Sequence, residues 1–220
     1  FIGGRVNGRN YPLIPRSTIL RNDSSKKKVV FTNFRIKDLD QIGMVTDAIW
    51  EDIDNDSWLD LILVGEWMPI TILKNNKGQF LNKTKDYGLE ETTGWWFSIA
   101  SGDFDQDGDT DFLIGNLGLN TQLKASREEP MRYHVQDIDN NGRIDPMLSY
   151  YIQGKSYPMA SRDELLGQVA PLKQVYTSYS SYAKATTDDV LKSGGILPKF
   201  ILDIKNLKSS FLEKKKDGSF

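Results

Sequence analysis

Asp103-Phe104-Asp105-Gln106-Asp107-Gly108-Asp109-Thr110-Asp111 is the stretch that decides the interpretation of this 220-residue chain. Carboxylates stand at positions 1, 3, 5 and 9 of the nine residues, and glycine stands at position 6. Oxygen donors on a tight turn are the ligands that Ca2+ prefers. Aspartates crowded this closely repel one another unless a cation neutralises them. The stretch therefore predicts a cation-binding loop.

The same spacing occurs at residues 52–60 (DIDNDSWLD) and 137–145 (DIDNNGRID), so the chain contains an internal repeat. We expect side-chain oxygens from positions 1, 3, 5 and 9 and a backbone carbonyl from position 7. The expected ligands are Asp52, Asp54, Asp56, Trp58, Asp60, Asp103, Asp105, Asp107, Asp109, Asp111, Asp137, Asp139, Asn141, Arg143 and Asp145. Up to three Ca2+ ions are expected.

The three copies of the loop differ in how well their residues suit Ca2+ binding. Gly108 suits a turn that needs a positive φ, whereas Ser57 at the same position is expected to strain its loop. Asn141 removes one formal charge from the third copy, which is expected to bind more weakly. The central copy is expected to bind most tightly, and the order of the other two stays open. The alternative is that one or more copies are acidic turns without metal.

These loops differ from an EF-hand, which has a helix on each side and a glutamate at position 12. Position 12 is Leu63, Ile114 or Leu148, each inside an apolar segment of strand character. The copies are therefore interpreted as metal loops that join two β-strands.

The composition excludes several classes of function. A net charge of −2 argues against a nucleic-acid partner, and no apolar run reaches the length of a membrane span. The chain has no cysteine and one histidine, which excludes thiolate sites, a thiol nucleophile and a two-histidine metal site. We assign neither catalytic residues nor an organic cofactor.

Hydrophobic periodicity predicts a mainly β fold in three parts: strand repeats over 1–160, a helical insertion over 161–193, and strands of a further, truncated repeat over 194–220. Strand character is expected at 1–6, 17–22, 29–32, 45–50, 61–65, 71–74, 79–81, 95–100, 112–115, 133–136, 147–151, 200–204 and 209–212. The second and third loops begin only 34 residues apart, which is short for four strands, so the second repeat is expected to lack a strand. Both ends of the chain look cut.

These residues resemble the FG-GAP/VCBS repeat family of calcium-loop β-propellers, which are related to the heads of integrin α-subunits. The resemblance rests on the three loops between apolar strands. The segments Gly65–Pro69, Gly94–Trp96 and Gly115–Asn120 resemble more closely the VCBS proteins of Bacteroidetes that are similar to cartilage acidic protein. The resemblance implies a partial β-propeller, because such rings usually close with about seven blades.

The resemblance also implies a secreted or cell-surface protein, with a signal peptide in its full-length form. The function expected is calcium-stabilised binding or adhesion, with a glycan or a protein as ligand. Two alternatives stay open: part of a polysaccharide lyase or hydrolase built on a propeller, and a purely structural module. The chain's five tryptophans are interpreted as packing between blades, except Trp58, which is expected to be exposed.

Overall fold

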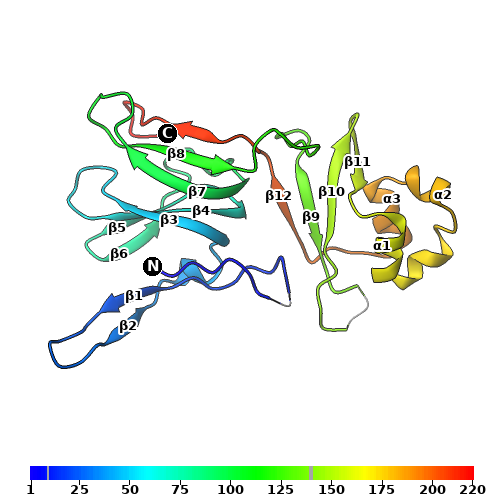
Figure 1. Ribbon diagram of the computed structural model, residues 1–220, viewed down its shortest axis with the longest axis horizontal. Helices are drawn as coiled ribbons and strands as arrows, with labels where there is room; N and C mark the ends of the chain where they lie inside the picture. The colour runs from blue at the N-terminus through cyan, green and yellow to red at the C-terminus, as the bar shows by residue number, and fades with distance from the viewer. Residues whose placement is uncertain (9, 139–140) are drawn as a thin grey trace. The chain divides into compact units, whose positions relative to one another are not determined.

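The structure, a computed structural model, describes residues 1–8, 10–138 and 141–220, and the chain forms two compact units. The first unit comprises residues 1–7, 14–118 and 207–220. The second comprises residues 8–13 and 119–206. The fold is mainly β, as predicted, with a small helical part (Figure 1).

The first unit is built on one antiparallel sheet of seven strands. The strands are β3 (Met44–Glu51), β4 (Asp60–Met68), β5 (Thr71–Asn76), β6 (Gln79–Asn82), β7 (Gly94–Gly102), β8 (Asp111–Asn116) and β13 (Ser210–Leu212). Strands β3 to β6 pair in chain order, which makes one four-stranded group. The end of β4 also pairs with β7, at Glu66↔Trp95 and Met68↔Gly94.

Strand β4 is buried along its whole length, because both of its faces are covered. Leu61 and Leu63 belong to one apolar cluster, while Ile62 and Val64 belong to another that contains Trp96. Successive side chains of a strand point to opposite faces, which accounts for the split. The strand predicted at 61–65 is therefore confirmed, and its continuous apolar run reflects burial on both faces.

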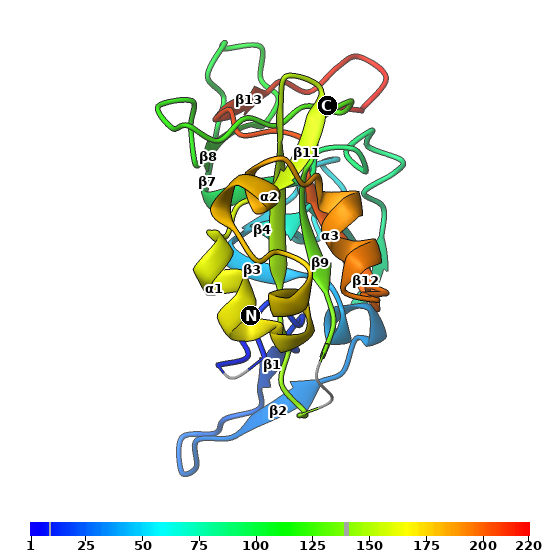
Figure 2. The same ribbon diagram turned by 90° about the vertical axis from the view of Figure 1, so that its right-hand side faces the viewer.

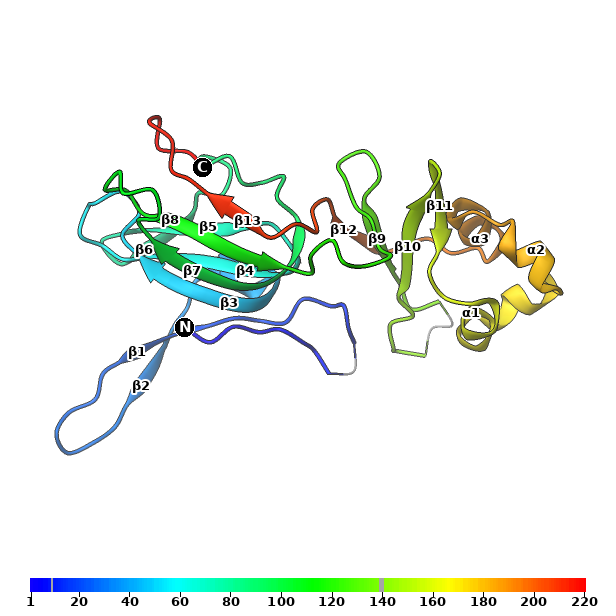
Figure 3. The ribbon, with the colours of Figure 1, turned by 45° about the horizontal axis from the view of Figure 1, so that its top comes forward.

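The second group of strands is completed by a segment far along the chain. β13 pairs with β8 through Ser210↔Ile114 and Leu212↔Phe112 (Figure 3). The chain therefore leaves this sheet after β8, forms the second unit and returns. The amide of Gly118 donates to the carbonyl of Leu207 at 2.8 Å, which holds the two ends of the excursion together. The strand expected to be missing from the second blade is supplied in this way.

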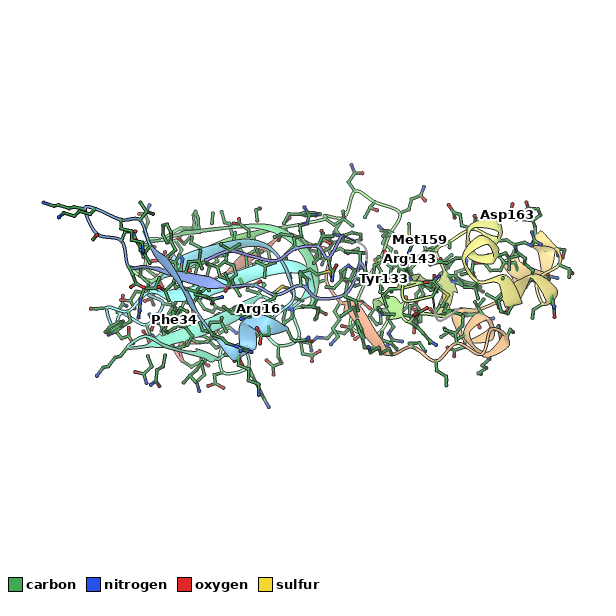
Figure 4. All side chains as sticks on the ribbon, turned by 90° about the horizontal axis from the view of Figure 1, so that it is seen from below. Arg16, Phe34, Tyr133, Arg143, Met159 and Asp163 are labelled. Atoms are coloured by element: carbon green, nitrogen blue, oxygen red, sulfur yellow. The ribbon has the colours of Figure 1, made fainter. Side chains whose placement is uncertain are left out.

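The strands predicted at 17–22 and 29–32 are confirmed and form a hairpin, with β1 (Ile19–Asn22) antiparallel to β2 (Phe31–Phe34). The ring of Phe34, labelled in Figure 4, contacts that of Phe80 edge to face at 6.3 Å. The 3-10 helix η1 (Lys37–Asp40) follows the hairpin. The first six residues are not a strand as expected, because their pairing is limited to a single bridge between Ile2 and Thr18.

The second unit contains a four-stranded sheet in the order β11-β10-β9-β12. Its strands are β9 (Met131–Val135), β10 (Met147–Ile152), β11 (Lys155–Pro158) and β12 (Phe200–Ile204). β12 pairs with β9 over five residues, from Phe200↔Val135 to Ile204↔Met131. Tyr133 of β9, labelled in Figure 4, also contacts the ring of Tyr11 at 5.8 Å.

The predicted helical stretch is a set of short helices within the second unit. They are α1 (Arg162–Gln168), the 3-10 helix η2 (Ala170–Gln174), α2 (Tyr179–Ala183) and α3 (Thr187–Ser193). A capping box begins α1: Ser161 accepts from the amide of Glu164, and the Glu164 side chain accepts from the Ser161 amide. Leu165, Leu166 and Leu172 bury themselves against Met147 of β10. Figures 1 and 2 show these helices gathered beside β10 and β11.

The structure places the domain boundaries elsewhere than at residues 160 and 194. Strands β9 to β11 precede residue 160, yet they belong with β12 and the helices rather than with the first unit. Among the described residues the sheets are open, which is consistent with a partial propeller. No helix in the described part has both the length and the apolar character needed to cross a lipid bilayer.

Candidate functional site

Each acidic loop joins two antiparallel strands. The first connects β3 to β4, the central one connects β7 to β8, and the third connects β9 to β10. The loops begin where the pairing ends, so position 9 is already at the start of the outgoing strand in the first two copies. The loops are therefore β-hairpin connections, without the flanking helices of an EF-hand.

The three loops share one pattern of hydrogen bonds from backbone amides to side-chain oxygens. In the central loop, the amides of Asp107 and Gly108 donate to the two oxygens of Asp103, at 3.1 Å each. The Asp109 amide donates to the Asp107 carboxylate at 2.8 Å, and the Phe104 amide donates to Asp111 at 3.2 Å. The corresponding bonds occur in the other two copies. The carboxylates at positions 1, 5 and 9 of the central loop therefore stabilise its conformation through hydrogen bonds that involve no cation.

The loop backbone requires left-handed conformations. Position 4 has a positive φ in the first two copies, 60° at Asn55 and 66° at Gln106. Position 6 has φ of 71° at Ser57, 89° at Gly108 and 81° at Gly142. Glycine adopts this conformation without steric cost, whereas serine does not. The positive φ expected at Gly108 and the strain expected at Ser57 are both present.

The central loop brings three carboxylates together. One oxygen from each of Asp103, Asp105 and Asp111 lies within 4.8 Å of the others. Burial, followed by the charges of Asp107, Asp111 and Asp103, raises the pKa of Asp105 above its usual value, although a hydrogen bond from the Asp107 amide opposes this. The Asp109 side chain lies outside the cluster, with Oδ1 3.4 Å from Nζ of Lys214. Such a set of hard oxygen donors fits Ca2+.

The first loop has a different electrostatic environment. Asp52, Asp54 and Asp56 also come within 4.8 Å of one another. The ammonium of Lys74, a residue of β5, lies 2.6 Å from Asp54, 3.0 Å from Asp56 and 3.1 Å from Asp60. Its hydrogen bond lowers the pKa of Asp56, the direction opposite to that at Asp105 in the central loop. A cation from the chain itself therefore contacts three of the four side-chain ligand positions.

The position 9 aspartates are buried and anchor each loop to the sheet. Asp60 is fully buried and accepts from the amides of Ile53 at 3.4 Å and Asn75 at 2.7 Å. Burial raises the pKa of Asp60, and the hydrogen bonds from Asn75 and Lys74 partly offset that effect. Asp111 is also buried and accepts from the amide of Lys214 at 3.4 Å. Position 9 thus accepts from a residue of the third strand, β5, in the first loop and from a residue just beyond the third strand, β13, in the central loop.

The third loop is described only in part, because Asp139, an expected ligand, lies outside the described residues. The amides of Asn141 and Gly142 donate to Asp137, and the amide of Ile138 donates to the buried Asp145. Position 7 is the exposed Arg143, labelled in Figure 4. The fold of this loop follows the other two wherever it is described.

Sequence reasoning missed Lys74. It stands 14 residues beyond Asp60, outside the repeat motif, and reaches the loop because β5 pairs with β4. The register Leu61↔Leu73 places Lys74 opposite Asp60. The signal was a lysine at the end of the strand predicted at 71–74, the second predicted strand after the first acidic loop.

The tryptophans are mostly packed, as interpreted. Trp96 is fully buried in the core, and the rings of Trp67 and Trp95 lie 5.6 Å apart. Trp50 contacts Phe80 edge to face but is 36% exposed, so it departs from the packing interpretation. Trp58, at position 7 of the first loop, has 42% of its surface exposed. Its exposure matches its expected place at the tip of a loop.

Comparison with protein families agrees with this geometry over part of the chain. Residues 52–114 match an FG-GAP-like repeat. The match begins at the first acidic loop and ends in β8, just beyond the central loop. This part of the chain is therefore an FG-GAP-like repeat with a β-rich, propeller-like fold. Comparisons with curated proteins and with solved structures give no match.

Proposed function

We propose that this chain is part of a calcium-stabilised β-propeller module of an extracellular or cell-surface protein, and that it acts by binding. The observation that carries the proposal is the central loop, where Asp103, Asp105 and Asp111 converge on a hairpin preorganised by backbone hydrogen bonds. Asp107 and the backbone carbonyl of Asp109 would complete an oxygen-only ligand set. The FG-GAP-like match over residues 52–114 supports a propeller as its setting.

The role of calcium in this proposal is structural. The aspartates of the loop repel one another, and a divalent cation would offset that repulsion at the turn that joins β7 to β8. A ligand that binds only the folded state stabilises it in proportion to its concentration over its dissociation constant. Extracellular calcium reaches the millimolar range that modest loop sites require.

The ligand proposed is a glycan or another protein, without turnover. The chain's one histidine, His134, is buried and its Nε2 is hydrogen-bonded to Oγ of the buried Ser149, which supports a structural role for this side chain. Binding to a glycan array, with no release of reducing ends or unsaturated sugars from polysaccharides, would support a binding module. Release of such products would favour the lyase or hydrolase alternative.

The calcium role is tested by thermal unfolding in EDTA and in millimolar calcium, followed by tryptophan fluorescence. We expect calcium to raise the melting temperature by several degrees, since saturation at a hundred times the dissociation constant contributes about 2.7 kcal/mol. Asp105→Asn should reduce this shift. Asp38→Asn, a matched change at an exposed aspartate on η1, should leave it unchanged. Equal melting temperatures in EDTA and in calcium would show that the structural-metal proposal is wrong.

A further inference from the structure

We propose that Lys74 takes the place of the metal ion in the first acidic loop, so that residues 52–60 hold their fold without calcium. This inference refines the proposed function, on which it rests for the central loop alone. The motif is the same in both loops, but the partner supplied by the neighbouring strand differs. The chain would thus contain one calcium-dependent loop and one loop with a built-in cation, side by side in the same sheet.

The position of the Lys74 ammonium carries the argument. Its nitrogen contacts the carboxylates of Asp54, Asp56 and Asp60, at positions 3, 5 and 9, within 3.1 Å. Those are three of the four side chains that would ligate an ion in this motif. Ca2+ binds oxygens at about 2.3–2.6 Å, so an ion on the same three carboxylates would lie in contact with the ammonium. Two cations of like charge would compete for one set of oxygens.

The lysine is also held in place. Its side chain is only 14% exposed, and Asp60 beneath it is fully buried. β5 fixes its backbone, because the next amide, that of Asn75, donates to Asp60 at 2.7 Å. A lysine on a flexible surface loop would swing away from an arriving ion, whereas this one is confined by the strand that carries it.

The central loop lacks this arrangement. The amide of Lys214 donates to Asp111, as that of Asn75 donates to Asp60, so Lys214 and Asn75 hold equivalent places. The registers agree, because Leu212 pairs with Phe112 as Leu73 pairs with Leu61. The residue equivalent to Lys74 is therefore Glu213.

Glu213 is exposed and carries the opposite charge. The ammonium of Lys214 contacts position 7, Asp109, at 3.4 Å, and not the cluster of positions 1, 3 and 9. The third strand thus brings a cation into the first loop and leaves the central cluster free to take one from solution.

The first test is calcium stoichiometry by isothermal titration calorimetry on the full chain. Asp54→Asn should leave the number of bound ions unchanged, because the first loop binds none. Asp105→Asn should remove one. Lys74→Met, which keeps the length of the stem and removes the charge, should add one ion. The double variant Lys74→Met with Asp54→Asn should lose that added ion. Lys77→Met, at an exposed lysine of the adjoining turn, is the matched control and should add none.

A second readout is specific to the first loop. Terbium bound there would be sensitised by Trp58 at position 7, so excitation of tryptophan should give terbium emission in Lys74→Met that disappears with Trp58→Phe. Wild-type protein should show no emission that depends on Trp58. If Lys74→Met unfolds in EDTA, it can be prepared in calcium, and the reciprocal variant Glu213→Lys should then lose the ion of the central loop.

The outcomes separate the two proposals. Loss of one ion from wild type on Asp54→Asn would overturn the role of Lys74 and leave the calcium-stabilised module standing. Absence of calcium binding in wild type, combined with a new site in Lys74→Met, would overturn the calcium role of the central loop and support that of Lys74. No gain in Lys74→Met would sink the inference in either case.

Discussion

Position 6 of the acidic loops shows how one residue sets the conformational cost of a turn. Ser57 and Gly108 adopt similar positive φ values of 71° and 89°. A residue with a side chain loses about 1 kcal/mol or more of folding free energy in this left-handed region. Glycine avoids that strain, but its more flexible unfolded state offsets part of the gain in stability. We predict that Ser57→Gly raises the free energy of unfolding by about 0.5–1 kcal/mol.

The reverse change, Gly108→Ser, should lower the free energy of unfolding by about 1 kcal/mol. A Cβ at Gly108 meets nothing within 4 Å, so backbone strain alone is tested. Ser57→Ala keeps the left-handed strain and should gain nothing. Urea unfolding in EDTA measures all three variants, and a loss of stability in Ser57→Gly would contradict the argument.

At this scale the sequence predicts what lies within the nine-residue motif. The spacing of aspartates indicates their shared carboxylate cluster, and glycine at position 6 indicates a positive φ. Lys74 was not predictable in the same way, because its contact with Asp54 depends on the pairing of two strands. Spacing along the chain says nothing about which side chain of the neighbouring strand reaches into a loop.

At the scale of elements, His134 links two strands of the second sheet. Its Nε2 lies 2.9 Å from Oγ of Ser149 on β10, and the residue is 7% exposed, while Nδ1 has no hydrogen-bond partner among the described residues. Burial, and then the charge of Arg132, lowers the pKa of His134 to about 4, against a smaller opposing effect of Asp188. The folded protein therefore keeps this ring neutral well below pH 6.

The contribution of the neutral His134 to stability is fully present above the pKa that this residue has in the unfolded chain, which is near 6.5. Between about pH 6.5 and 4, His134 is protonated in the unfolded chain but stays neutral in the folded chain. The free energy of unfolding therefore falls as the pH falls. At pH 5 we expect the loss due to His134 to be about 2 kcal/mol. His134→Gln should remove this part of the pH dependence in urea unfolding of the second unit. Identical pH profiles for wild type and variant would contradict it.

Strand positions were largely predictable, and strand partners were not. Alternation and apolar runs located β3 to β10 to within a few residues, and turn residues located the hairpins. β13 shows where such reasoning ends, since Ser210–Leu212 pairs with β8 after an excursion of about ninety residues. A strand of three residues contains no sequence pattern that would identify so distant a partner strand. The expected shortage of a strand in the second blade was the one indication that a strand would arrive from elsewhere.

At the scale of the whole molecule, the second unit interrupts the first at a point where the chain can be rejoined. Gly118 and Leu207 are hydrogen-bonded to each other across the excursion. The entropic cost of closing a loop rises slowly with its length, so a short linker between these two residues costs less than a long one. We predict that replacing residues 119–206 with a short Gly/Ser linker leaves the first unit folded.

Tryptophan fluorescence is a clean measure of that deletion, because Trp50, Trp58, Trp67, Trp95 and Trp96 all lie in the first unit. The shortened chain should keep the emission maximum and the calcium response of the full chain. A second deletion that also removes residues 207–220 is the control. It takes away β13 and Phe220, whose ring packs 5.4 Å from that of Phe112, and should therefore expose the β8 edge and red-shift the emission. If the linker variant unfolds although it retains all core residues of the first unit, then the first unit depends on the second for its stability. In that case the two units do not fold independently.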